Sequence, residues 1–369
     1  MRIAYIAVKG IPFCGGVEKV TEEVGSRLAA KGHEVTVYSS RDFGTRDGMY
    51  RGMLIRTVPS LRHQAFHKLS ICWHATRDVM RHRSADLVHV HAVGPSLFSL
   101  FPRMKGIPTV VQTHGPEWKR DKWGLLGKTF LRLSDFSVPY FPNAVTAVSK
   151  DQKAYYEKRY GREVVYIPNG VSPVERRPPQ RILEQGLVPN RYVLFAARLV
   201  PEKGAHFLIE AFRGLNTDMK LVIAGDSVHA HSYKAHLRSL AGGDPRILFP
   251  GFVTGAPLEE LFSNAYLFCL PSTVEGLSVV LLEAMNFGCC CLSSDIAGNR
   301  ESIEGHGYTF RSRDTADLGR VLKDLIEHPG SVHEKKASAQ EYVRRNYSWD
   351  LVTDQMEKFY RSVIDKKGK

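Results

Sequence analysis

The chain has 369 residues, of which 43% are hydrophobic and 24% are charged, a composition that excludes a disordered chain and, at this length, suits two α/β domains of about 150 to 180 residues each. The formal net charge is +13, and most of it lies in residues 1–170, where 26 Lys and Arg face 14 Asp and Glu. A basic half predicts an anionic partner, which composition alone leaves open as nucleic acid, an acidic membrane surface or a phosphorylated acceptor.

No stretch of the sequence predicts a signal peptide, a membrane span or a disulfide framework. The apolar start, residues 3–8, is too short for a signal peptide and predicts a buried strand. The apolar stretch 266–292 is interrupted by Pro271, Glu275 and Glu283. The six cysteines, three of them consecutive at 289–291, lack the spacing of disulfide frameworks and zinc sites. We therefore expect a reduced, cytoplasmic protein.

The first half of the chain predicts a Rossmann-like domain over residues 1–172. After the first strand, a glycine turn at 14–16 precedes a helix in which Val17, Val20, Val24 and Leu28 share one face. A strand follows at 35–38, which makes the opening a β-turn-α-β unit of a parallel, doubly wound sheet. Further strands are predicted at 87–90, 109–112 and 144–148.

The second half predicts another α/β domain. Residues 173–190 are rich in Pro, Arg and Gln without apolar periodicity, and they predict a domain linker. Strands are then predicted at 192–196, 220–224, 247–249, 267–270 and 289–292, within a second domain over 191–348. The last segment, 349–369, contains a helical pattern at 351–364 that we expect to pack back on the first domain.

The most specific motif is the segment 271–285, a loop after a strand followed by a helix with Glu275 and Glu283 eight residues apart. A helix that starts near Leu277 would direct its first amides and the positive end of its dipole at an anion, such as a diphosphate. Glu275 would lie beside the group attached to that diphosphate, and Glu283 would accept hydrogen bonds from vicinal hydroxyls. The alternative is that Glu275 caps the helix and Glu283 lies on a solvated face.

A second motif is the segment 195–204, where a strand ends at Arg198 and a turn brings Lys203 to the start of the next helix. Two fixed cations at the carboxyl edge of a sheet suit a phosphate leaving group, because Arg binds it bidentately and Lys acts as a point charge. The alternative is two surface cations near a turn, and it loses weight once the Glu275 loop is placed at the same edge.

These two motifs, in this order and at this separation, resemble the nucleotide-sugar glycosyltransferases of the GT-B fold, specifically glycosyltransferase family 4. The resemblance covers essentially the whole chain and includes the segments 15–18, 167–171 and 224–226. It implies an α/β fold of two Rossmann-like, doubly wound domains facing a central cleft. The segment 112–124 is most similar to bacterial rhamnosyltransferase-type members of surface-polysaccharide pathways.

The resemblance also implies a mechanism. It implies a retaining hexosyl or deoxyhexosyl transfer in which Arg198, Lys203 and the amides after Gly276 bind the donor diphosphate. Glu283 would bind the ribose, Glu275 would hold the transferred sugar, and His114 would reach toward that sugar from the first domain. The expected catalytic residues are Glu275, His114, Arg198 and Lys203. The expected donor-binding residues are Gly15, Gly16, Arg198, Lys203, Glu275, Gly276, Leu277, Ser278, Val279 and Glu283.

The resemblance implies neither a catalytic metal nor a cofactor, and the sequence has no Asp-x-Asp pair for a diphosphate-bound Mg²⁺. Gly15 and Gly16 lack a Cβ and would let the acceptor or the donor phosphates approach the backbone, although a plain tight turn is the alternative. Ser172 and Gly115 stand where acids are common in the family, which leaves the donor and acceptor preference open.

Basic and aromatic residues alternate at helical spacing between Trp118 and Phe141. Such a segment suits an interface with an anionic membrane, and it equally suits an ordinary amphipathic helix. Together with the basic half, it favours peripheral contact with the inner face of the cell membrane and a saccharide or polyprenyl-diphosphate-linked acceptor. The same surface is expected to include Arg62, His63, His67, Lys68, Arg77, Arg81, His82 and Arg83.

Three other functions remain open. A nucleic-acid-binding protein would explain the basic half, but the sequence has neither an RNP-like aromatic motif nor a zinc-finger pattern. An NAD-dependent oxidoreductase would use the opening β-turn-α-β unit, but the turn at 10–16 lacks G-x-G-x-x-G spacing. A GT-B-fold sugar epimerase would share the donor site and differ in having no acceptor.

Overall fold

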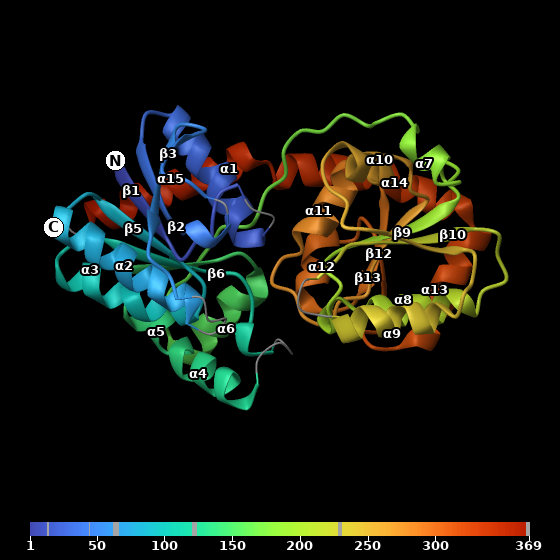
Figure 1. The fold of residues 1–369 in the computed structure, drawn as a ribbon, viewed down its shortest axis with the longest axis horizontal. Helices are drawn as coiled ribbons and strands as arrows, with labels where there is room; N and C mark the ends of the chain where they lie inside the picture. Colours follow the sequence, from blue (N-terminus) through green and yellow to red (C-terminus); the bar gives the residue numbers. More distant parts are fainter. Residues whose placement is uncertain (13–14, 44, 62–65, 120–123, 228–230, 367–369) are drawn as a thin grey trace. The chain divides into compact units, whose positions relative to one another are not determined.

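The structure is a computed structural model that describes residues 1–12, 15–43, 45–61, 66–119, 124–227 and 231–366. It divides into two compact units, one of residues 1–170 with 349–369 and the other of residues 171–348 (Figure 1). Part of the predicted basic and aromatic surface, namely Arg62, His63, Arg120, Lys122 and Trp123, lies outside the described residues. No helix in the described part of the chain is long and apolar enough to cross a membrane.

The first unit is built on a sheet whose described strands follow the order β3-β4-β2-β1-β5-β6-β7-β8. All neighbouring strands are parallel except β3 and β4. The strands are β1 (Arg2–Ile6), β2 (Glu34–Ser40), β3 (Gly48–Tyr50), β4 (Met53–Val58), β5 (Leu87–His91), β6 (Thr109–Thr113), β7 (Ala144–Ala147) and β8 (Val165–Tyr166). The predicted parallel, doubly wound sheet is confirmed, and its order reverses between β1 and β5.

Helices cover both faces of this sheet. One face packs against α1 (Gly16–Ala30) and α15 (Trp349–Asp365). The other packs against α2 (His67–His82), α5 (Ser137–Tyr140) and α6 (Lys150–Tyr160). The remaining helical elements are η1 (Arg41–Phe43), η2 (Gly94–Ser99), α3 (Leu100–Met104), η3 (Glu117–Lys119) and α4 (Leu125–Asp135). The central strands are buried on both sides, which explains their nearly continuous apolar sequences.

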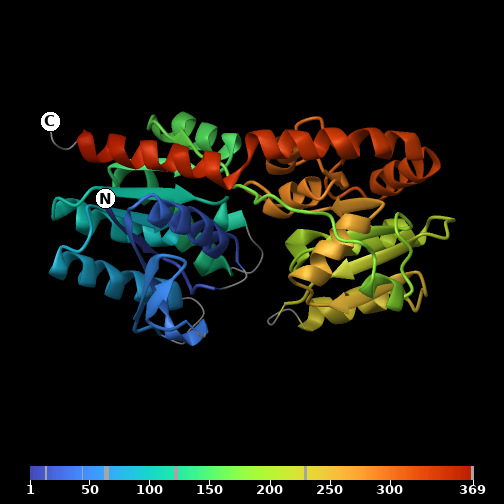
Figure 2. The ribbon, with the colours of Figure 1, turned by 90° about the horizontal axis from the view of Figure 1, so that it is seen from above.

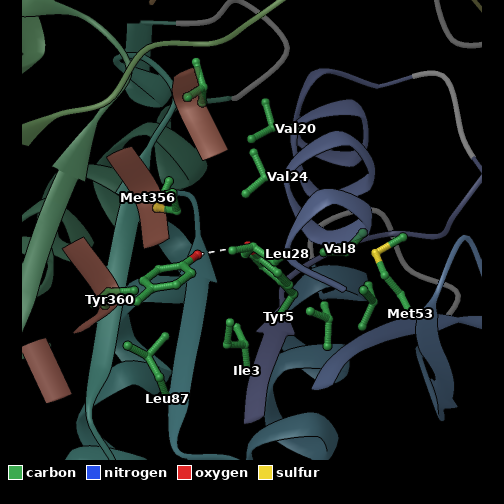
Figure 3. Close-up of a cluster of buried hydrophobic side chains, with 14 of the residues drawn as sticks. Ile3, Tyr5, Val8, Val20, Val24, Leu28, Met53, Leu87, Met356 and Tyr360 are labelled. Carbon is green, nitrogen blue, oxygen red and sulfur yellow. Dashed lines mark hydrogen bonds between the residues drawn. The ribbon is translucent and has the colours of Figure 1, made fainter. Parts of the chain in front are cut away.

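The last helix, α15, lies beside α1 in both views (Figures 1 and 2). Its apolar side packs into the core shown in Figure 3, where the Tyr360 hydroxyl lies 2.9 Å from the Tyr5 hydroxyl. Ion pairs line the rim of this contact, with Arg27 bound to Asp350 at 2.7 Å and Lys31 to Glu357 at 2.9 Å. Apolar burial and ionic contacts together therefore hold the C-terminal helix on the first unit.

The second unit has an all-parallel sheet with the described order β11-β10-β9-β12-β13-β14. Its strands are β9 (Tyr192–Ala196), β10 (Lys220–Ala224), β11 (Ile247–Gly251), β12 (Leu267–Leu270), β13 (Cys290–Ser294) and β14 (Tyr308–Phe310). Five of these were predicted, three of them (β9, β10 and β12) with identical bounds, whereas β14 was missed because it has only three residues and one buried side chain. In this unit the strand order reverses between β9 and β12.

The helices of the second unit also lie on both faces of its sheet (Figure 1). They are α7 (Arg181–Glu184), η4 (Pro201–Lys203), α8 (Ala205–Arg213), α9 (His231–Ala241), α10 (Ala256–Asn264), α11 (Val279–Asn286), α12 (Ala297–Ile303), α13 (Thr315–Glu327) and α14 (Pro329–Asn346). The segment 173–190, expected as a linker, lies against α10. The amide of Arg177 donates to Ser263 Oγ at 2.9 Å, and that of Ile182 donates to Glu260 Oε1 at 3.0 Å.

Candidate active site

Two of the predicted site residues meet at the carboxyl edge of the second sheet. β9 and β12 are neighbours at the point where the strand order reverses, and ligands of doubly wound sheets bind outside the strand ends at such a point. Lys203, in η4 after β9, and Glu275, in the loop after β12, form an ion pair with Nζ and Oε1 2.5 Å apart. Only 16% of the Lys203 side chain and 12% of the Glu275 side chain are exposed, so water screens the pair weakly.

Glycines allow the two loops to approach each other closely. Gly204 has φ of +73°, and a Cβ there would lie 2.0 Å from the Pro271 carbonyl oxygen, at the end of β12. A direct hydrogen bond from the Thr273 amide to the Glu202 carbonyl, 2.9 Å long, fixes the same approach. Because no side chain fits at Gly204, this glycine is required for the two loops to bring Lys203 and Glu275 into contact.

Arg198 is placed at the same strand edge, just beyond the end of β9. Its side chain is exposed, and no hydrogen bond or ion pair joins its guanidinium to any residue that the structure describes. Its backbone is fixed, since the Leu199 amide donates to Asp226 and the Val200 amide to Arg198 itself. An exposed cation on a hydrogen-bonded backbone, at the edge that holds the Lys203–Glu275 pair, is available to an anionic ligand.

The helix after the Glu275 loop begins slightly later than predicted. α11 starts at Val279, and Ser278 is its N-cap, so the expected start near Leu277 is wrong by two residues. Leu277 precedes the helix, and its apolar side chain is buried. The Ser278 amide already donates a hydrogen bond to Ser302 Oγ at 3.2 Å. No side chain caps α11, so the positive end of its dipole stays at this edge.

The other two predicted residues of this motif lie on either side of the helix start. Gly276 is buried, and a Cβ on Gly298 of α12 would lie 2.1 Å from the Gly276 carbonyl oxygen, so α12 packs directly on the loop backbone. Glu283 is half-buried, one turn into α11 from Val279. Glu275 pairs with Lys203 and does not cap the helix, which removes that alternative.

A buried amide network beneath the loop was missed by the sequence analysis. Asn299 of α12 donates through Nδ2 to Ser272 Oγ at 3.1 Å and to Ser294 Oγ at 2.9 Å. These serines follow β12 and end β13, and all three side chains are fully buried. Asn299 therefore ties two strand ends together under the Glu275 loop. The available sequence signal was a serine two residues beyond each of two predicted strands, which by itself does not indicate a network.

His114 lies in the first unit, directly after β6, and is half-buried. Its Nε2 is 3.0 Å from Nδ1 of His91, the last residue of the neighbouring strand β5, and His91 Nε2 is 3.0 Å from Thr21 Oγ1 of α1. The sequence analysis missed His91 and Thr21. Two histidines in alternation, at 89 and 91, were the available signal, because alternate residues of a strand share a face.

Burial keeps the inner histidines of this group neutral. Burial lowers the pKa of His91 well below its usual range, and the neighbouring histidines lower it further. Burial also lowers the pKa of His89 to about 3. The ring of His91 stacks on Tyr5 with centroids 5.7 Å apart and planes 5° from parallel. His89 and His91 are thus polar but uncharged at this edge of the first sheet.

Gly15 and Gly16 lie at the start of α1, where Gly15 is the N-cap. A Cβ on Gly16 would have no described atom within 4 Å, so no close approach to the described residues of the unit requires that glycine. The buried carboxylate of Glu18, in the first turn of α1, accepts a hydrogen bond from the Lys9 amide at 3.2 Å. An acid already occupies this helix end, which makes it a poorer site for phosphates than α11.

Among the described residues, no cluster of three or more His, Cys, Asp or Glu side chains could hold a metal ion. The described cysteines, Cys72, Cys269, Cys289, Cys290 and Cys291, are free and buried. Burial raises the pKa of the Cys72 thiol to about 12, so it is unreactive as a nucleophile.

Comparison with known families matches the two halves of the chain separately. A family model described as Glycosyltransferase Family 4 matches residues 14–175, and one described as Glycosyl transferases group 1 matches residues 184–346. The phosphatidyl-myo-inositol mannosyltransferase of Mycobacterium leprae is 26% identical over 100% of this chain and 99% of its own. An uncharacterized glycosyltransferase of Methanocaldococcus jannaschii is 28% identical over 49% of this chain, and this match spans about half, 47%, of the relative.

Solved structures share the fold over nearly the whole chain. Sucrose-phosphate synthase from Thermosynechococcus elongatus superposes with a TM-score of 0.86 at 20% identity, covering 99% of this chain and 100% of that one. Anabaena HepE, solved with UDP and glucose, gives a TM-score of 0.81 at 18% identity, covering 98% and 100%. The two matched halves correspond to the two Rossmann-like units, and the chain therefore belongs to the family 4 glycosyltransferases of the GT-B fold, enzymes that use a nucleotide-sugar donor.

Proposed function

We propose that the chain is a retaining glycosyltransferase that moves a hexosyl or deoxyhexosyl group from a nucleoside diphosphate to a saccharide or polyprenyl-diphosphate-linked acceptor in cell-surface polysaccharide assembly. The observation that carries the proposal is the Lys203–Glu275 pair at the point where the second sheet reverses its strand order. An ionic pair at this edge combines a phosphate-binding cation with a carboxylate for sugar hydroxyls. The rhamnosyltransferase-type likeness of residues 112–124 stays an expectation about the sugar.

The donor diphosphate binds to Arg198, Lys203 and the start of α11 in this proposal. Arg198 is exposed and unpaired among the described residues, and Lys203 is held in place by Glu275. The uncapped first turn of α11 adds amide donors and the positive end of a helix dipole. These groups stabilise the charge that develops on the departing diphosphate, an effect of several kcal/mol in comparable sites. In the proposed mechanism they take the place of a metal ion.

Each of the two carboxylates in the motif has its own proposed role. Glu275 contacts the transferred sugar from the loop, and its bond to Lys203 fixes the distance between the sugar and diphosphate subsites. Glu283, one turn into α11, accepts hydrogen bonds from the ribose hydroxyls. His114 binds a hydroxyl of the transferred sugar from the first unit. The retaining outcome follows from the family resemblance and is read from the anomeric configuration of the product.

Exposed apolar side chains on α4 support contact with an anionic membrane. Leu125, Leu126 and Leu133 are 81%, 88% and 73% exposed, whereas Leu131 of the same helix is buried against its unit. Arg132 is exposed on the same helix, and Phe136 follows it with 54% of its surface exposed. A helix with exposed leucines and an exposed basic residue suits the interface of a bilayer with acidic lipids. A lipid-linked acceptor is presented at that interface.

The first experiment is a thermal-shift panel with UDP, GDP, TDP, ADP and NAD, each with and without EDTA, since a ligand of the native state raises its melting temperature. UDP is tested first because HepE was solved with UDP and with UDP-glucose. A shift with one diphosphate that EDTA does not change supports the proposal and names the base. A shift with NAD alone, or a diphosphate shift that EDTA abolishes, contradicts it.

The membrane contact is tested by flotation with vesicles of phosphatidylcholine alone and of phosphatidylcholine with phosphatidylglycerol. We expect binding to the anionic vesicles only, and its loss in the double variant Leu125→Ser, Leu126→Ser. The matched control is Leu183→Ser with Val188→Ser, which removes leucine and valine side chains that are 51% and 57% exposed on the second unit. Equal binding of the two double variants would overturn the assignment of α4.

A further inference from the structure

A chain of hydrogen bonds in the first unit leads from a helix backbone to His114. Thr21 Oγ1 donates to the Val17 carbonyl at 2.9 Å, within α1. The same oxygen lies 3.0 Å from His91 Nε2, and His91 Nδ1 lies 3.0 Å from His114 Nε2. Thr21 and His91 are completely buried, whereas His114 is only half-buried. The chain thus starts at a fixed carbonyl and ends at a predicted site residue.

The donors and acceptors along this chain can be assigned from its starting point. The Val17 carbonyl only accepts, so the single hydroxyl proton of Thr21 points to it. Thr21 Oγ1 must then accept from His91, which places the His91 proton on Nε2. A neutral His91 with its proton on Nε2 has an unprotonated Nδ1. His114 therefore donates to it through Nε2.

The surroundings of His91 hold it neutral and fix its ring plane. Its ring stacks on Tyr5 and lies 4.4 Å from the ring of His89. The hydroxyl of Tyr360, from α15, bonds both the Tyr5 hydroxyl and His89 Nδ1 (Figure 3 shows the two tyrosines). Among the described residues, the charge of Lys68 also disfavours a protonated His91 ring. Burial lowers the pKa of His91 well below its usual range, in agreement with a neutral imidazole.

We propose that Thr21 and His91 are positioning residues that hold His114 with a proton on Nε2, so that Nδ1 is the atom through which His114 binds a sugar hydroxyl and gains or loses a proton. This inference rests on the proposed role of His114 in the transfer. The Nε2 proton is present whether His114 is neutral or cationic, because His91 Nδ1 accepts in both cases. The orienting partner of a catalytic imidazole commonly acts in this way by fixing its tautomer.

The proposal is tested first by a spectroscopic measurement that does not depend on activity. Two-bond ¹H–¹⁵N spectra of histidine-labelled protein report which ring nitrogen carries the proton, and the His114 signals are assigned by their loss in His114→Gln. We expect Nε2–H for His114 in the unaltered protein. In Thr21→Val, His91 loses its acceptor, its proton moves to Nδ1, and His114 is forced to Nδ1–H. An Nδ1–H signal in the unaltered protein, or no change in Thr21→Val, overturns the proposal.

Kinetics separate positioning from mere stability. Thr21→Val should lower kcat roughly 100-fold with little change in donor KM, since an imidazole in the wrong tautomer loses most of its contribution. Thr21→Ser keeps the hydroxyl and should restore kcat. Thr76→Val is the matched control, because Thr76 is a buried helix threonine of the same unit whose hydroxyl has no partner among the described residues. Equal losses in Thr21→Val and Thr76→Val contradict the positioning role.

The failure of the proposed function has a different signature. If His114→Ala retains full transfer activity, the catalytic role of His114 is wrong, while the spectra still decide the tautomer. If His114→Ala loses activity but Thr21→Val keeps kcat together with a changed tautomer, His114 acts in the transfer without help from Thr21 and His91. The positioning role of these two residues is then wrong, while the proposed function stands.

Discussion

Each unit of the molecule contains a sheet whose strand order reverses, but the carboxyl edges of the two sheets carry different chemistry. In the second unit the loops after β9 and β12 hold Lys203 and Glu275 as an ion pair. In the first unit the ends of β5 and β6, next to the reversal between β1 and β5, hold His91 and His114 in a hydrogen-bonded chain in which His91 is neutral. The same type of sheet therefore presents an ionic edge, formed by Lys203 and Glu275, in the second unit and a neutral edge, formed around the buried His91, in the first.

The difference follows from how deeply each group is buried. Lys203 and Glu275 keep some contact with water, and each compensates the charge of the other. His91 has no exposed surface and no carboxylate partner among the described residues, so a charge on it would be costly to desolvate. An ionic edge suits a ligand that carries its own charge, such as a diphosphate. A neutral edge suits a sugar hydroxyl, which is bound by oriented hydrogen bonds rather than by an opposite charge.

The largest expected effect comes from removing the cation of the ionic edge. We expect Lys203→Ala to lower kcat/KM roughly 100- to 1000-fold, the usual loss for one preorganised group that stabilises developing charge. It should also weaken binding of the free nucleoside diphosphate, measured by calorimetry. Lys220→Ala is the control, since Lys220 begins β10 at the opposite edge of the same sheet. His114→Ala should leave diphosphate affinity unchanged. Equally weakened diphosphate binding in Lys203→Ala and His114→Ala would contradict the proposed difference between the two edges.

The next effect separates the two carboxylates within the ionic edge. Glu275→Gln keeps the shape of the side chain and should lower kcat about 100-fold, with diphosphate affinity nearly unchanged. Glu283→Gln should instead raise the diphosphate dissociation constant about tenfold, the value of one charge-assisted hydrogen bond. Glutamine is preferred to alanine at 275 because Lys203 depends on Glu275 for its position. Loss of diphosphate affinity in both variants would contradict the division of roles.

A smaller effect tests the backbone beneath the ionic edge. Gly204→Ala places a Cβ 2.0 Å from the Pro271 carbonyl oxygen at a positive φ, and we expect it to lower the free energy of unfolding by about 2 to 4 kcal/mol. Gly243→Ala is the matched control, because Gly243 has nearly the same φ, +75°, with nothing within 4 Å of the added Cβ. The control should lose only about 1 to 2 kcal/mol. Urea unfolding measures both, and equal losses would show that strain alone, without the loop contact, explains Gly204.

Sequence patterns predicted the ionic edge better than the neutral one, for physical reasons. Charged residues after a strand stand out, and parallel strands bring their carboxyl ends to one edge, so the proximity of Lys203 and Glu275 followed from order alone. His91 ends a buried strand, and its partner Thr21 comes from a helix 70 residues away in sequence. Periodicity gives the face of each residue but not which helix packs over it, so the chain from Thr21 to His114 could not be predicted.

Strand positions were predicted well for a related reason. Strands buried on both faces are continuous apolar runs, and β9, β10 and β12 have the predicted bounds. The start of α11 was wrong because Leu277 extends the apolar run, although its side chain is buried before the helix begins. The segment 173–190 lacks periodicity because only two of its apolar side chains, Ile182 and Leu187, are buried, while hydrogen bonds to α10 hold its backbone.

The smallest expected effect concerns the ion pairs between α1 and α15, which lie in the first unit but not at its neutral edge. Hydrogen bonds from Arg361 and Lys31 lower the pKa of Glu357 to about 2. The unfolded chain therefore takes up this proton first, near its ordinary value of about 4.3. The stabilisation is complete above that pH and is lost as the pH falls toward 2.

Because water reaches this surface, we expect Glu357→Gln to lower the free energy of unfolding at pH 7 by only about 1 kcal/mol. The difference between the variant and the unaltered protein should shrink steadily between pH 5 and pH 3 in urea unfolding. Glu163→Gln, at an exposed carboxylate of the same unit, should match the unaltered protein at every pH. A Glu357→Gln deficit that persists unchanged at pH 3 would mean that lost packing, not lost charge, weakens α15, and the ionic contacts of the first unit would then have no measurable part in holding its last helix.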